Sequence, residues 1–110
     1  MAKMIHTSII IHATPDRVWN ILTDTDRYPE WNPFIRSIRG ELKEGNRITA
    51  RIQKMTFKPM VLVYEKNRTL EWLGSLYIKG LFDGKHRFRI TDNGDGSVTF
   101  EQSEVFKGIL

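Results

Sequence analysis

Cysteine is absent from the 110-residue chain, which excludes disulfides, thiolate metal sites and cysteine nucleophiles. Long apolar runs are absent too, because no stretch approaches the roughly 20 apolar residues that a membrane-spanning helix requires. The N-terminus, Met1-Ala2-Lys3, leads directly into a β-like run, so no signal peptide is predicted. These absences predict a cytoplasmic protein without stable membrane insertion.

Several chemical motifs are also missing. The sequence contains no glycine-rich phosphate loop and no serine nucleophile elbow. His6 and His12 are six residues apart on a predicted strand, and no carboxylate stands at ligand spacing beside them. We therefore expect neither a metal site nor a cofactor.

Charge of one sign is not concentrated in runs, although the formal net charge is +4. Lys and Arg are scattered singly, and acidic residues lie between most of them. This distribution is typical of a solvated surface, so no nucleic-acid partner is predicted. The exposed edge of the strand around Arg47–Arg51 is left as a candidate for weak contact with an anionic surface.

The N-terminal third predicts a strand and two short helices. The strand covers Met4–His12, with its odd positions turned inward. Thr14 is a candidate N-cap and Pro15 suits the first helical position, so a helix is predicted to about Thr23. A second helical turn is expected over Asp26–Trp31.

Alternating patterns then predict six consecutive antiparallel strands, which with the first make seven. An α+β fold follows, because the helices are grouped near one end of a meander. A seven-stranded sheet with the usual twist curves, and its concave face has to be filled. The six strands are expected at about Phe34–Glu41, Arg47–Gln53, Phe57–Glu65, Thr69–Leu73, Leu81–Thr91 and Ser97–Lys107.

The last two strands indicate what lines the concave face. A turn with Gly96 in the left-handed conformation would pair Phe88 with Phe100 and His86 with Gln102. The even positions of both strands then face inward, and they include Glu104. Three explanations stay open for this polar cluster: its members satisfy one another, they orient the polar group of a ligand, or His86 and Glu104 act as acid and base.

Longer motifs carry a resemblance to a known superfamily. They are Ala13-Thr14-Pro15-Asp16-Arg17-Val18-Trp19, Asp26-Arg27-Tyr28-Pro29-Glu30-Trp31-Asn32-Pro33-Phe34, Leu70-Glu71-Trp72 and Gly96-Ser97-Val98-Thr99. In this order the chain resembles the START-related, polyketide-cyclase-like SRPBCC superfamily. The resemblance implies a helix-grip fold, in which a seven-stranded sheet wraps around a long C-terminal helix. Residues 1–110 would form a single such domain.

The resemblance also implies a central cavity that binds lipids, sterols, polyketides, hormones or quinone-like molecules. A minority of such proteins are cyclases or hydrolytic enzymes. The expected ligand-binding residues, with Phe100 added from the hairpin pattern, are Trp31, Phe34, Trp72, His86, Phe88, Phe100, Gln102 and Glu104.

The sequence departs from the superfamily at its end. It stops at Leu110, where the long helix ordinarily begins, so we expect the domain to be truncated there. A partner, a homodimer mate or a ligand is the other possible cover for the apolar face. Binding of a small hydrophobic molecule is the favoured function. The alternatives are a cyclase, dehydratase or hydrolase that uses His86 and Glu104, and an interaction module whose groove accepts a helix.

Overall fold

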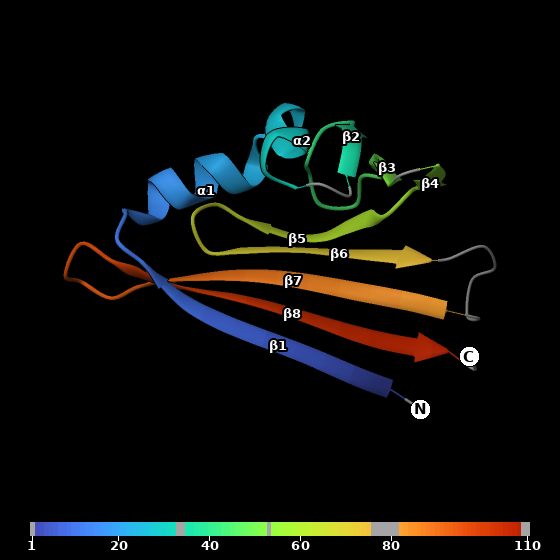
Figure 1. Cartoon of the computed structure of the whole chain (residues 1–110). Coiled ribbons are helices and arrows are strands. Elements are labelled where there is room, and N and C mark those ends of the chain that lie inside the picture. Colours follow the sequence, from blue (N-terminus) through green and yellow to red (C-terminus); the bar gives the residue numbers. More distant parts are fainter. Residues whose placement is uncertain (1, 33–34, 53, 76–81, 109–110) are drawn as a thin grey trace.

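The computed structural model of the chain describes residues 2–32, 35–52, 54–75 and 82–108. Strand β1 (Ala2–Ile11) leads into helix α1 (Pro15–Thr23), the 3-10 turn η1 (Thr25–Arg27) and helix α2 (Tyr28–Trp31). The strands that follow are β2 (Ile35–Arg39), β3 (Thr49–Ile52), β4 (Met55–Phe57), β5 (Met60–Glu65), β6 (Thr69–Ser75), β7 (Phe82–Asp92) and β8 (Val98–Gly108). This element order confirms the predicted α+β class (Figure 1).

Helix α1 begins where the sequence predicts it. The Thr14 hydroxyl accepts a hydrogen bond from the Arg17 backbone N–H at 3.3 Å, and Pro15 occupies the first turn, where it needs no N–H partner. One stripe of the helix is apolar, and it faces the sheet. The buried members of that stripe are Val18, Trp19 and Leu22.

The strands form two antiparallel sheets instead of the single seven-stranded sheet that the sequence predicts. The order is β1-β8-β7-β6-β5 in the large sheet and β2-β3-β4 in the small one. The predicted strand Phe57–Glu65 is divided into β4 and β5 around Pro59, which has no N–H to donate to a ladder. Backbone hydrogen bonds from Ile48 to Pro59 (3.0 Å) and from Val61 to Asn46 (2.8 Å) still join the two sheets.

The register of the β7–β8 hairpin differs by two residues from the predicted one. His86 lies opposite Glu104 and Phe88 lies opposite Gln102. The turn is centred one residue later than the predicted pairing requires, because Asn93 donates its backbone N–H to the Ser97 carbonyl at 3.0 Å and closes a loop over residues 93–97. Gly96 has the predicted left-handed backbone, with φ of 86°. A shift of two residues keeps every side chain on its face, so the predicted inner face survives.

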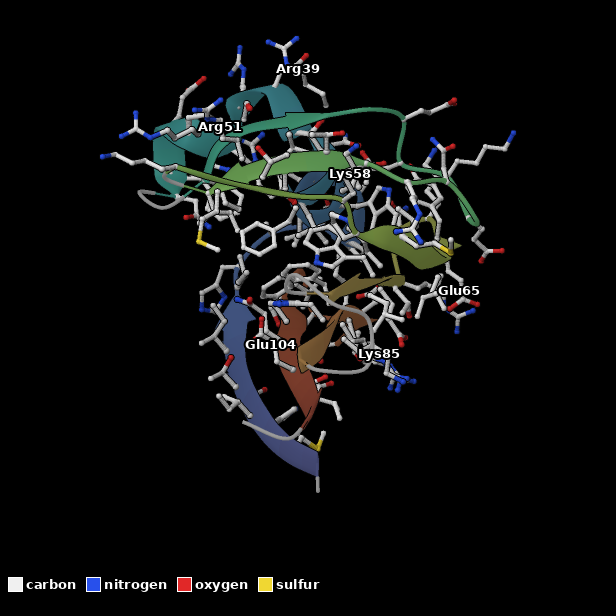
Figure 2. The ribbon with its side chains drawn as sticks, turned by 90° about the vertical axis from the view of Figure 1, so that its right-hand side faces the viewer. Arg39, Arg51, Lys58, Glu65, Lys85 and Glu104 are labelled. Carbon is white, nitrogen blue, oxygen red and sulfur yellow. The ribbon has the colours of Figure 1, made fainter. Side chains whose placement is uncertain are left out.

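The helices and the small sheet form a layer over one end of the large sheet, and the core lies between them (Figure 1). Buried side chains come from both layers: Val18, Trp19, Leu22, Tyr28, Ile38, Ile48 and Ala50 from the covering layer, and Val61, Leu70, Phe88, Ile90 and Val98 from the large sheet. Strands β1 and β8 extend beyond the cover (Figure 2). We call the side of the large sheet that bears this core its inner face. Its covered half lies over β5–β7, and its open half lies over β1 and the adjoining part of β8.

Candidate functional site

Cross-strand rows on the inner face bring the site residues together. One row runs from Ile5 on β1 through Glu104 and His86 to Trp72 on β6. Opposite residues of an antiparallel pair share a face and have neighbouring Cβ atoms. Nδ1 of His86 therefore lies 2.7 Å from Oε1 of Glu104, within hydrogen-bond distance.

The imidazole of His86 lies in an aromatic environment. Its ring centre is 4.2 Å from that of Phe88 and 5.9 Å from that of Trp72. Nε2 of His86 is buried, and no hydrogen-bond partner reaches it from the part of the chain that the structure describes. A buried polar atom without a partner costs about 1–3 kcal/mol, so a ligand group or a water molecule that reaches Nε2 would recover that free energy.

The hydrogen bond to Glu104 determines what Nε2 can do. An ionised carboxylate only accepts hydrogen bonds, so Nδ1 of His86 carries the proton of that pair. In the neutral imidazole the other nitrogen then presents a lone pair. In that neutral form Nε2 is a hydrogen-bond acceptor that lies within an aromatic surface.

The aromatic surface continues toward α1. The rings of Trp72 and Phe88 are 5.3 Å apart, and those of Phe88 and Phe100 are 6.1 Å apart. Phe100 also lines a pocket of about 340 Å³ under the first helix. The described residues that line the pocket include one charged side chain, that of Arg17; the lining is Ile11, Ala13, Arg17, Val18, Ile21, Leu22, Trp31 and Phe100.

The site is thus a curved sheet with an aromatic inner face and a histidine–carboxylate pair. Residues 3–109 of the chain match the family described as polyketide cyclase / dehydrase and lipid transport. The chain belongs to that family. No curated relative matches it. Among the described residues, no helix is long and apolar enough to cross a membrane.

Solved structures show the same fold. CalU16 from Micromonospora echinospora is 25% identical with a TM-score of 0.75, and the match covers 97% of this chain and 62% of CalU16. The chain thus spans less than two thirds of CalU16. A START superfamily protein from Mycobacterium smegmatis is 17% identical, with a TM-score of 0.76 over 97% of this chain and 78% of that one. Norcoclaurine synthase from Thalictrum flavum, in complex with dopamine and hydroxybenzaldehyde, is 13% identical, with a TM-score of 0.73 over 96% and 69%.

These matches confirm the predicted SRPBCC and helix-grip assignment. The eight predicted ligand-binding residues fall into two groups, of which the first comprises five residues of the inner face. His86, Glu104, Trp72 and Phe88 lie together, and Phe100 connects them to the pocket under α1.

Three predicted residues lie elsewhere. Gln102 is on the inner face opposite Phe88, but it is exposed and its side chain makes no hydrogen bond within the described part of the chain. Trp31 lines the pocket under α1 and packs against Tyr28, with ring centres 4.7 Å apart. Phe34 lies outside the described residues.

Sequence reasoning missed Arg17 and Ile21 as pocket residues. For Ile21 the sequence offers a signal, because this residue belongs to the apolar stripe of α1. The structure shows it exposed, so it is available to line a pocket. Arg17 carries no such signal, since a single arginine in a first helical turn is ordinarily a solvated residue.

Two pKa shifts belong to groups outside the site. Burial raises the pKa of Tyr28, whose hydroxyl donates to the backbone carbonyl of Leu22. Hydrogen bonds from the side chain and backbone of Ser97 lower the pKa of Asp95 in the β7–β8 loop. Both groups make local hydrogen bonds, Tyr28 with Leu22 and Asp95 with Ser97.

The outer face of the large sheet has a different chemistry. There Glu71 is buried between Arg87, with Nε at 3.1 Å, and Lys85, with Nζ at 3.4 Å. His6 and Glu101 form a second histidine–carboxylate pair at 3.0 Å on that face. This pair is exposed, so water can satisfy it, and it provides a matched control for His86 and Glu104.

Proposed function

We propose that this domain binds a small hydrophobic molecule on its inner face and that Nε2 of His86 accepts a hydrogen bond from a hydroxyl group of that molecule. The observation that carries the proposal is the buried Nε2, which lies within an aromatic surface and has no hydrogen-bond partner among the described residues. A binding site of this kind is mostly apolar, with a few polar groups that fix orientation. The family description, which includes lipid transport, agrees with it.

The shape of the surface suggests how such a molecule would lie. A ring near His86 would contact Phe88 and Trp72, and a longer apolar body would pass Phe100 toward the pocket under α1. Aromatic contacts supply area and favour planar groups. Glu104 would act by positioning the imidazole, since it holds the proton on Nδ1.

A pair of probes of equal shape tests the hydrogen bond. 2-Naphthol carries a hydroxyl where 2-methylnaphthalene carries a methyl group. We expect 2-naphthol to bind about three- to ten-fold more tightly, because one net hydrogen bond contributes on the order of 1 kcal/mol. His86→Leu should remove this preference while leaving the affinity for 2-methylnaphthalene nearly unchanged.

The matched control is His6→Leu, which removes the histidine of the exposed outer pair. It should leave the preference intact. Equal affinities of the two probes for the unmodified chain would contradict the role of His86. Failure to bind either probe, with the fold intact, would contradict hydrophobic ligand binding altogether. Sedimentation at two concentrations shows whether a second copy occupies the face instead.

The same pair supports an enzymatic alternative. An imidazole oriented by a carboxylate is the usual arrangement of a general base, here with Nε2 free to take a proton. Within the described residues only Glu104 hydrogen-bonds His86, so no nucleophile is in place beside it. Conversion of a co-purified molecule, followed by mass spectrometry and lost in His86→Ala, would favour catalysis over binding.

A further inference from the structure

The positive charge of the chain is concentrated in one part of the fold. Residues 35–64 contain seven of the 17 basic residues and two of the 13 acidic ones, which gives this segment a net charge of +5. The remaining residues therefore carry a net charge of −1, against +4 for the whole chain. The segment comprises β2, β3, β4 and most of β5.

The small sheet turns these charges to the outside. Ile38 and Ala50 point into the core, so their neighbours Arg39 and Arg51 point away from it. Figure 2 shows both arginines extending from the small sheet on the side opposite the large sheet. Arg36, Lys54 and Lys58 are exposed residues of the same segment, and we call these three together with Arg39 and Arg51 the basic face.

The charges of the basic face are not neutralised by ion pairs with described acidic residues. Within the described ranges none of its five residues forms an ion pair. The two acidic residues of the segment, Glu41 and Glu44, both lie in the loop between β2 and β3, and Glu44 accepts the backbone N–H of Tyr64 at 3.1 Å. Uncompensated cations on one surface attract an anionic partner.

We propose that the basic face docks this domain on an anionic lipid bilayer. The alternative partner, a nucleic acid, is less well matched, because sheets that bind single strands present exposed aromatic side chains on which bases stack. The only aromatic residue of these three strands is Phe57, which is half-buried and pairs with the inward Ala50. A bilayer requires only charge, and it is also the phase from which a hydrophobic ligand would come.

Vesicle flotation tests the docking directly, with phosphatidylcholine vesicles that contain or lack phosphatidylglycerol. We expect binding only when phosphatidylglycerol is present, and a decrease as salt rises. Arg39→Gln with Arg51→Gln should weaken binding roughly 25-fold, since each basic residue near an anionic surface contributes about five-fold. The control is Arg68→Gln with Arg89→Gln, which removes the same charge from exposed positions outside the basic face and should have little effect.

Three results would overturn the proposal. The first is equal binding to both kinds of vesicle, and the second is equal weakening of binding by the two double variants. The third is release of the protein from the vesicles by a short RNA whose phosphate concentration is lower than that of the lipid. The vesicle experiment contains no hydrophobic ligand. Its outcome is therefore independent of the naphthol measurements, and either proposal can fail alone.

Discussion

The covered and open halves of the inner face are made from the same kinds of residues but have opposite exposures. Ile9 on β1 is 57% exposed, whereas Ile90, two strands away in the same cross-strand row, is 5% exposed. The row that contains His86, separated from this one by the row of Phe88, changes from Ile5, which is 53% exposed, to Val61, which is fully buried. Burial here depends on what lies above the sheet and not on the pattern within a strand.

The histidine–carboxylate pair lies at the border between the halves. The His86 side chain is 20% exposed and that of Glu104 is 38% exposed. Deeper in the covered half a histidine would need a protein partner for each nitrogen, and farther into the open half water would supply one. At the border Nε2 is buried, while the His86 side chain as a whole is still 20% exposed, so a ligand that enters from the open half can approach it.

The largest expected effect comes from truncating one residue in each half. Leu70→Ala, in the covered half, should lower the free energy of unfolding by about 2–5 kcal/mol, because it leaves a cavity beside Phe88. Ile9→Ala, in the open half, should cost less than about 1 kcal/mol, since most of its surface is already in water. Urea unfolding of both variants measures the difference.

Equal costs for the two variants would break the comparison, because they would show that Ile9 is buried in solution. That result would itself be informative, since it would indicate that another copy of the chain or a bound ligand covers the open half. Repeating the unfolding of Ile9→Ala at two protein concentrations identifies that case.

A smaller effect is expected at Tyr28, where the covering layer is held together. Tyr28→Phe leaves the Leu22 carbonyl without its hydroxyl donor and should cost about 1–2 kcal/mol. Burial raises the pKa of Tyr28, whereas an unfolded tyrosine has a pKa of about 10. The contribution to stability is complete below about pH 10 and is lost as pH rises further, because only the unfolded state releases the proton readily.

Urea unfolding at neutral and alkaline pH measures this dependence. The unmodified chain should lose stability above pH ~10 more steeply than Tyr28→Phe does. Parallel pH profiles for the two proteins would mean that the Tyr28 hydroxyl titrates normally in the folded state and that the covering layer is loose.

Local signals explain which parts of the fold were predictable. Thr14 and Pro15 mark the start of α1 by satisfying or removing N–H groups, which requires no knowledge of distant residues. The division at Pro59 was also readable in principle, since proline interrupts a ladder. The separation into two sheets was not, because it depends on how β4 and β5 pair on either side of that proline.

The site was predictable as a face and not as a set of contacts. Alternation on β7 and β8 placed His86 and Glu104 on the inner face, and that survived a register shift of two residues. The shift was unpredictable because the hydrogen bonds between Asn93 and Ser97 set the position of the turn along the chain. It exchanged Gln102 for Glu104 opposite His86, and with it an amide for a carboxylate.

The smallest expected effect compares the two sides of β1, where Ile9 and Ile10 are both exposed but face opposite ways. If the open half takes part in the proposed binding, Ile9→Thr should weaken 2-methylnaphthalene binding roughly two- to four-fold, through the loss of apolar contact. Ile10→Thr should leave the affinity unchanged and, like Ile9→Thr, should barely alter stability. Fluorescence titration of both variants with 2-methylnaphthalene measures this difference. Equal affinities of Ile9→Thr and Ile10→Thr would restrict the binding surface to the covered half and to the border at His86.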